Sequence, residues 1–252
     1  MTKRSGTGRF VGRNRFVLLF GTLVGLCALG SILHQFRDAF HPRVPPFLEG
    51  MVFVGFLLVA IVPIANGRGG RLFVLMFALP AVALWFVGVV VESDAVIVAR
   101  HLFLAPFLGY MIWVMFRVIF DSQQVTFNTV CASLCIYLLL GIVWSLAYSL
   151  VDVLDPAAFT RATPEGSQPT QLRIGRGDTR ALYFSFATLT TLGYGDIVPT
   201  SPICRMLAIF EAIAGQLYLA VMVARLVGMH IVHSMEGNKA QGGAPRGEDD
   251  CT

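Results

Sequence analysis

The chain has 252 residues, of which 56% are hydrophobic and only 13% are charged. This composition, with a mean hydropathy of +0.70, excludes an ordinary soluble domain and is typical of an integral membrane protein. The net charge of +4 is too small for a nucleic-acid footprint. The cysteines form no CxxC pair or Cys/His cluster, so neither a disulfide framework nor a metal site is predicted. Four of the five cysteines (Cys27, Cys131, Cys135, Cys204, Cys251) lie in or beside apolar spans, where we expect them to be small buried hydrophobic residues.

Four apolar spans are predicted in the first 120 residues, after a basic segment at 1–15. A helix needs about 20 apolar residues to cross a bilayer, and the stretches of suitable length are Phe16–Leu33, Phe47–Ala65, Leu72–Val91 and Ala95–Phe120. The basic head and first apolar run also fit a signal peptide, with a cleavage site near Ala28-Leu29-Gly30. We expect the first helix to be retained, because this run is long for a signal peptide.

The charges between the spans predict the orientation. One side carries the basic residues of segment 1–15, Arg68, Arg71, Arg117, Lys239 and Arg246. The other side carries the acidic turn at 92–94, although also Arg37 and Arg43. The positive-inside rule therefore predicts that both termini are cytoplasmic.

The fourth span lacks the charges of a voltage sensor. A sensor needs several arginines at every third position, since each charge crossing the field contributes about 2.3 kcal/mol per 100 mV. This span offers only Arg100, His101 and Arg117. We expect Arg100 and His101 to pair with Glu92 or Asp94, and the protein to show little voltage dependence.

Two more spans, Phe127–Val151 and Cys204–Val232, flank a long insert. The insert starts with Asp152–Asp178, which contains three prolines and is predicted to be an exposed loop. A short aromatic run, Thr179–Thr190, follows and is predicted to be a helix too short to cross a bilayer. The polar tail at 233–252 is predicted to be disordered.

The stretch Thr191–Asp196 reads Thr-Leu-Gly-Tyr-Gly-Asp. Its glycines alternate with Leu192 and Tyr194, and glycine adopts unusual φ/ψ values without steric cost. Successive carbonyls can therefore point the same way. Rings of such carbonyls can replace the hydration shell of a cation, and irregular backbone at membrane depth is tolerated where it lines a water-filled path.

This stretch resembles the selectivity filter of the potassium channel family, among the tetrameric P-loop cation channels. Residues 127–232 resemble that family's pore domain, with outer helix, turret, pore helix, filter and inner helix. The first 120 residues resemble the prokaryotic six-transmembrane type only in their number of spans. The resemblance implies an all-α membrane protein of six transmembrane helices, with a re-entrant pore helix and filter between helices 5 and 6.

The resemblance also implies a function. It implies a homotetramer in the bilayer of a prokaryotic cell membrane, because one chain supplies one filter strand and a ring needs four. The protein would conduct K⁺ passively, without a cofactor or enzymatic activity. The carbonyls of Thr191, Leu192, Gly193 and Tyr194 would hold the ions, with Gly195 completing the filter and the Thr191 hydroxyl forming the innermost ring. Leu192 replaces the commoner Val or Ile, so we expect retained conduction with altered filter stability.

Several residues would support the filter. By resemblance, Asp196 would hold its shape at the outer mouth by hydrogen bonding, and Thr190 would adjoin its inner end. Tyr183 and Phe184 stand where the family has an aromatic cuff around the filter tyrosine, Tyr194. Simple apolar packing of the two rings is the alternative.

The inner helix carries three further candidates. Glu211 and Gln216 are polar residues at membrane depth, where they are costly unless satisfied or facing water. Some family members place a glutamate where this chain has Ala187, and we expect Glu211 to hydrogen-bond the pore helix instead. Gln216 would face the cavity. Gly215 falls at the family's hinge position, although close packing is the alternative.

Other functions remain open. Gly-Tyr-Gly-Asp also fits the Gly-x-Gly-Asp pattern of intramembrane aspartyl proteases, which need a second aspartate to share a proton. The candidates for it, Asp121 and Asp152, fall at span ends. A nonselective cation channel and a silent subunit are further alternatives. A secondary transporter would have a second interrupted helix in its other half. The sequence shows a single interruption, so a transporter is less favoured.

Overall fold

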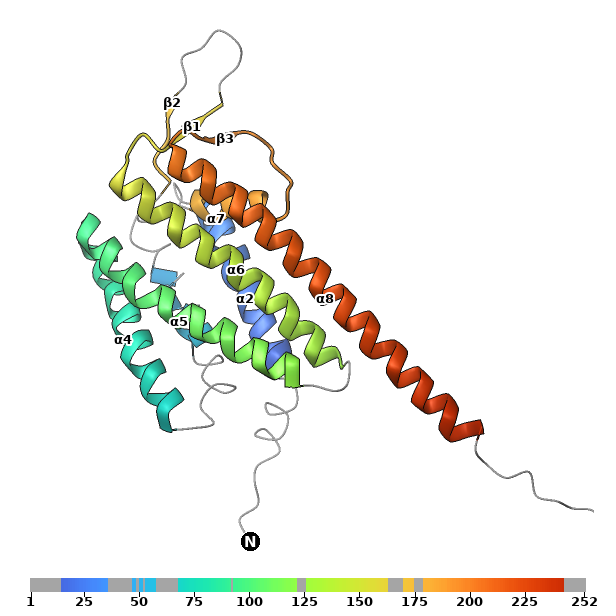
Figure 1. Cartoon of the computed structure of the whole chain (residues 1–252). Helices are drawn as coiled ribbons and strands as arrows, with labels where there is room; N and C mark the ends of the chain where they lie inside the picture. Colours follow the sequence, from blue (N-terminus) through green and yellow to red (C-terminus); the bar gives the residue numbers. More distant parts are fainter. Residues whose placement is uncertain are drawn as a thin grey trace, which may run out of the picture.

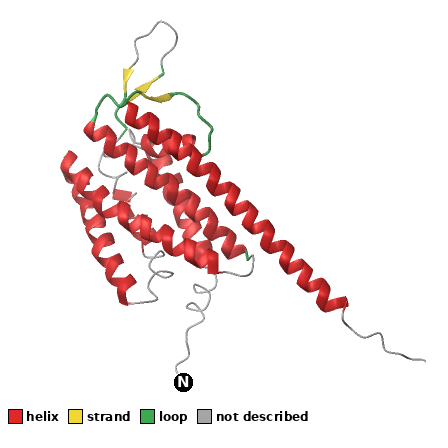
Figure 2. Ribbon diagram, in the orientation of Figure 1, coloured by secondary structure: helices red, strands yellow, loops and turns green. Residues whose placement is uncertain are grey.

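The structure is a computed structural model that describes residues 15–35, 47–48, 50–51, 53–57, 68–91, 93–121, 126–162, 170–174 and 179–242. Its elements, drawn in Figures 1 and 2, are α2 (Arg15–Gln35), α4 (Arg68–Val90), α5 (Asp94–Asp121), α6 (Phe127–Leu154), β1 (Phe159–Arg161), β2 (Thr170–Gln171), α7 (Arg180–Leu189), β3 (Ile197–Pro199) and α8 (Pro202–Gly242). The segments 47–48, 50–51 and 53–57 are also helical.

The long helices form a bundle in which α5 packs between α4 and α6, and α2 packs on α6 (Figure 1). The short α7 lies against both α6 and α8. Within the described residues, four segments are long and apolar enough to cross a membrane: Leu72–Val90, Asp94–Asp121, Phe127–Leu154 and Pro202–Gly228. These agree with the third to sixth predicted spans.

The first two predicted spans are less complete. The first coincides with α2, but its apolar part, Phe16–Leu29, is shorter than the other spans. Most of the second, the predicted loops around Arg37 and Arg176, and Glu92 itself lie outside the described residues, whereas Ser93 and Asp94 of the predicted acidic turn connect α4 to α5. A total of six membrane helices therefore stays a prediction.

Two clusters of buried side chains hold the molecule together. The larger cluster joins α2, α4, α5 and α6, and its fully buried members include Leu19, Phe107 and Ile136. The smaller cluster lies where α6, α7 and the strands meet. In it, Phe184 makes edge-on ring contacts with Tyr148 at 4.9 Å and Phe159 at 5.3 Å between centroids. Phe184 therefore packs as a core residue within this chain.

The segment after α6 forms a small sheet, where the sequence predicted an exposed loop. The strands are antiparallel in the order β2-β1-β3, so β1 pairs with strands on both sides. Phe159 and Ile174 are fully buried and Leu172 is 7% exposed. The prolines in this segment obscured these apolar positions, of which 172 and 174 alternate as in a strand. The expected all-α fold therefore carries a three-stranded sheet at one end of the bundle.

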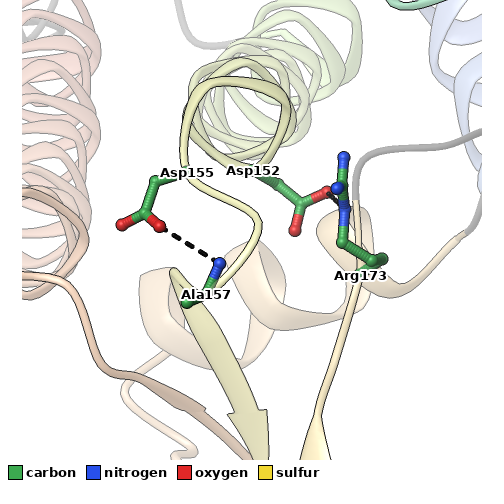
Figure 3. Close-up of polar contacts among 4 residues, drawn as sticks. All are labelled: Asp152, Asp155, Ala157 and Arg173. Atoms are coloured by element: carbon green, nitrogen blue, oxygen red, sulfur yellow. Dashed lines mark hydrogen bonds and ion pairs between the residues drawn. The ribbon is translucent and has the colours of Figure 1, made fainter.

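An ion pair ties this sheet region to α6 (Figure 3). Asp152 is fully buried in the last turn of α6, and its Oδ2 accepts a hydrogen bond from Nε of Arg173 at 3.0 Å. Asp155, just after the helix, accepts from the Ala157 backbone N–H at 3.1 Å. Both contacts fix the direction in which the chain leaves α6.

Helix α8 is longer than predicted. It contains 41 residues and continues to Gly242, through half of the tail that was expected to be disordered. Residues 233–242 contain no proline, and adding a residue to an existing helix costs far less than starting one. Figure 1 shows this end of α8 extending beyond the other helices.

Arg225 joins α8 to the end of α5. Its guanidinium donates to the Ile119 carbonyl at 2.5 Å and lies over the ring of Phe120, 4.3 Å from the centroid. The last carbonyls of a helix have no partner within it, so Arg225 caps α5 from the neighbouring helix.

The basic side chains of α5 lie against aromatic or backbone groups. Arg100 lies 4.9 Å from the centroid of the Trp85 ring, and Arg117 stacks on a tryptophan one turn earlier at 4.8 Å. His101 is 5% exposed and its Nδ1 hydrogen-bonds the Ile97 carbonyl. The described residues of α5 do not form an arginine ladder.

Candidate functional site

The short helix α7 is fastened to α6 along its length. The Ser185 hydroxyl lies 2.7 Å from the Gly141 carbonyl, and the Tyr137 hydroxyl donates to the Leu189 carbonyl at 3.2 Å. A glycine at position 141 lets α6 and α7 approach this closely, because a Cβ there would lie 2.5 Å from the Phe186 ring of α7. The position of α7 is therefore set by side-chain contacts at its middle and its end.

Glu211 of α8 binds α7 through the same serine, Ser185. Its carboxyl group is fully buried, with Oε1 2.5 Å from the Ser185 hydroxyl and Oε2 accepting from the Tyr148 hydroxyl at 2.6 Å. A buried polar group is tolerated when its hydrogen bonds are made. The hydrogen bond expected between Glu211 and this helix is thus formed by Ser185, while its effect on a filter stays a prediction.

Gly215 lies where α8 meets the end of α7. A Cβ built at this glycine would lie 2.5 Å from the Leu189 carbonyl oxygen and 2.9 Å from its Cδ1. The helix runs unbroken through this position. The geometry therefore favours the close-packing interpretation of Gly215 over the hinge.

The backbone after α7 alternates between two conformations. Thr191, Gly193 and Gly195 have positive φ values of 57°, 54° and 74°, while Leu192 and Tyr194 do not. Where residues alternate in this way, successive N–H groups turn to one side of the chain. Their carbonyls consequently turn to the other side.

The N–H groups of this stretch are occupied by the end of α7. Thr191 donates to the Thr188 carbonyl at 2.9 Å, and both Leu192 and Gly193 donate to the Ala187 carbonyl at 2.8 and 3.1 Å. These bonds also satisfy carbonyls that the helix end leaves open. The N–H side of the stretch therefore faces α7.

The carbonyls of residues 191–194 accept no hydrogen bond within the described part of the chain. The stretch also lies on the surface of the single chain, where Leu192 is 56% and Tyr194 67% exposed. Unpaired carbonyl oxygens in a row are the ligands that strip water from a permeating cation. This arrangement can bind cations, provided that other groups complete the coordination shell.

The outer end of the stretch is tied to α7 and to the sheet. The Tyr183 hydroxyl donates to Oδ1 of Asp196 at 3.1 Å, and its ring stacks on Tyr194 with centroids 6.3 Å apart. The Ala162 N–H donates to the Asp196 carbonyl at 3.0 Å. Desolvation, and then the hydrogen bond to Asp196, raise the pKa of Tyr183. The phenol therefore remains a donor at neutral pH.

Two other predicted residues lie nearby. The Thr190 hydroxyl donates to the Phe186 carbonyl one turn earlier, at 2.7 Å, and so extends the helical end before the stretch. Gln216 is exposed on α8, which is compatible with a face toward a cavity.

The residues of α6 that position α7, namely Tyr137, Gly141 and Tyr148, were not predicted from the sequence. Their separations of four and seven residues place them on one face of a helix. Aromatic residues with polar tips, on the same face as a glycine, were the available signal. Ser185, which contacts both the Gly141 carbonyl and Glu211, gave no such signal.

Part of this region is similar to a known protein family. Residues 176–230, which include α7, the alternating stretch and the first part of α8, match a family model described as "Ion channel". The match supports an ion channel family, and together with the apolar helices it indicates a membrane protein with a role other than catalysis.

A curated relative, protein LctB of Bacillus caldotenax, is 33% identical over 91 residues, which are 36% of this chain. Those residues cover 64% of the relative, less than two thirds of its length. No solved structure matches the chain.

Proposed function

We propose that this chain is one subunit of a homotetrameric, passive, potassium-selective channel of the cell membrane, with residues 191–195 as its filter. The single observation that carries the proposal is the row of carbonyls at 191–194, which accept no hydrogen bond from the described residues, while the N–H groups of Thr191, Leu192 and Gly193 bind carbonyls of α7. Such a row offers a dehydrated cation oxygen ligands along a path.

The exposed side of α8 supports a tetramer. Large apolar side chains recur on it at helical spacing, each 49–60% exposed: Met206, Phe210, Ile213, Leu217 and Val221. Contiguous apolar surface of this kind marks a contact with lipid or another protein. Four copies around one axis would cover this stripe and bring four carbonyl rows face to face.

The position of α7 supports cation selectivity. Its C-terminal end lies beside Thr191, and the negative end of a helix dipole favours a cation there. A cation entering the ring of carbonyls would exchange water oxygens for backbone oxygens without meeting a side-chain charge.

The same contacts disfavour an aspartyl protease. Asp196 binds Tyr183, and Asp152 binds Arg173 on the sheet. Shared protonation requires two carboxyl groups within hydrogen-bonding distance. The described residues do not bring these two together.

The lack of an arginine ladder in α5 leads to a second part of the proposal, namely weak voltage dependence. Gating charge measured in patch recordings tests it. A charge of several elementary units per tetramer would contradict it.

The decisive experiment is the reversal potential of the purified protein in a planar bilayer under opposing potassium and sodium gradients. We expect a value near the potassium equilibrium potential. Gly193→Ala should abolish the selective current, because alanine is strained at a φ of 54°. Gly109→Ala is the matched control, since nothing lies within 4 Å of a Cβ at that position.

The other outcomes contradict the proposal. Current without discrimination would show a nonselective pore, and Leu192→Val would then test whether the leucine is responsible. Absence of current from a correctly assembled oligomer would refute conduction by this chain alone.

A further inference from the structure

We propose that Glu211 is held as the neutral carboxylic acid, and that in this form it is the positioning residue that fixes α7 between α6 and α8. The observation is a chain of three short contacts that crosses these helices, from Tyr148 through Glu211 and Ser185 to Gly141. The side chains of Tyr148, Ser185 and Glu211 are all fully buried, so water cannot complete their hydrogen bonds.

The number of protons in this chain assigns the protonation state. Ser185 has one hydroxyl proton, yet its oxygen lies 2.5 Å from Oε1 of Glu211 and 2.7 Å from the Gly141 carbonyl oxygen. A backbone carbonyl and an ionised carboxylate can both only accept. With Glu211 ionised, one of these two close oxygen contacts would contain no hydrogen.

One proton on Glu211 satisfies every contact. Oε1–H of Glu211 donates to the Ser185 hydroxyl, which then donates to the Gly141 carbonyl. The Tyr148 hydroxyl donates to Oε2 at 2.6 Å. Each oxygen pair then has one hydrogen between its members, and the three helices are joined by a continuous chain of donors and acceptors.

The surrounding charges agree. Glu211 forms no ion pair among the described residues, and an ionised carboxylate is very costly to bury without a partner. The ionisable groups that interact with it from α6 are the phenols of Tyr137 and Tyr148, which are neutral at pH 7. On α7, the residue that contacts Glu211 is Ser185. Nothing in this set compensates a negative charge.

Ionisation would have a defined mechanical effect. Loss of the proton removes the donor from Glu211 to Ser185 and places a charge between three apolar helices. We expect α7 to loosen as pH rises through the titration of this group. In so far as it concerns the filter, this consequence rests on the proposed channel function, whereas the protonation state does not.

Infrared spectroscopy of the purified protein tests the protonation state without any need for conduction. We expect wild type at neutral pH to show the C=O stretching band of a protonated carboxyl group, and Glu211→Gln to lack it. Asp155→Asn is the matched control and should leave the band in place, because Asp155 is only partly buried and binds a backbone N–H. A wild-type spectrum with carboxylate bands alone would overturn the proposal.

Substitution tests the positioning role. In Glu211→Gln the amide N–H can donate to Ser185 and the amide oxygen can accept from Tyr148, so we expect a wild-type thermal midpoint that no longer falls at high pH. Glu211→Ala and Ser185→Ala should both lower the midpoint. A glutamine variant as unstable as the alanine variant would show that the negative charge is required. A protonated band in a protein without potassium selectivity would refute only the channel function.

Discussion

Replacing Gly215 by alanine tests how closely α8 packs on α7. The added Cβ would lie 2.5 Å from the carbonyl oxygen of Leu189, a main-chain atom that cannot rotate away. Overpacking a well-filled interior costs about 1–3 kcal/mol, whereas Gly→Ala within a helix gains about 1 kcal/mol. We therefore expect a net loss of up to about 2 kcal/mol in the free energy of unfolding.

Gly228→Ala in the same helix isolates the packing term. Nothing lies within 4 Å of a Cβ at Gly228, so this variant should show only the gain in helix propensity. Because that gain is common to both variants, their difference in stability equals the overpacking cost of about 1–3 kcal/mol. Denaturant unfolding in detergent measures it. Adding Leu189→Ala should not restore Gly215→Ala, since the closest atom belongs to the backbone.

The refuting result is equally clear. Equal stability of the Gly215→Ala and Gly228→Ala variants would show that the contact with Leu189 is not tight. If Gly215→Ala then altered only the open probability, with ion selectivity and stability unchanged, the hinge interpretation would replace the packing interpretation.

Three further changes test other contacts. Tyr183→Phe removes the donor to Asp196 but keeps the stacked ring. The lost hydrogen bond is worth about 0.5–1 kcal/mol, and we expect the current to decline faster while ion selectivity stays intact. An unchanged rate of current decline would contradict this role. Arg173→Gln removes the charged partner of buried Asp152 and should lower the free energy of unfolding by about 1.5–3 kcal/mol. We expect the lower value, because Arg173 is 35% exposed. An unchanged unfolding midpoint would show that the pair is not stabilising. Arg225→Gln removes the cap at the end of α5 and should lower the free energy of unfolding by a similar amount. We expect faster amide hydrogen exchange at that end alone. Uniform exchange along α5 would exclude the capping role.

Elements that repeat over many residues could be predicted from the sequence. Helices α5 and α6 each have 28 residues, most of them apolar, and this length and composition indicate a span. The predicted short helix also agrees with α7, because Thr179 and Thr190 are its caps. The alternating glycines after it, expected to adopt unusual φ/ψ values, have positive φ at Gly193 and Gly195.

Contacts between distant residues could not be predicted. The strands β1 and β2 contain three and two residues, too few for a period to appear, and β1 also pairs with β3, which follows α7 in the chain. The sequence also left Gly215 undecided, because spacing along a helix says nothing of the distance to Leu189. For Glu211, polarity at membrane depth indicated that a partner exists, but only the fold identifies Ser185 and Tyr148.

The unbroken length of α8 makes it a lever. From Gly215 to its last residue, Gly242, the helix extends about 40 Å at 1.5 Å per residue. With its pivot beside α7, a tilt of about 10° would move the far end by roughly 7 Å, on the dimensions of an α-helix. Rearrangements too small to resolve around Glu211 would thus be amplified at the distal end. Distance probes attached near residue 242 should report the state of α7 more sensitively than probes placed beside the carbonyl row itself.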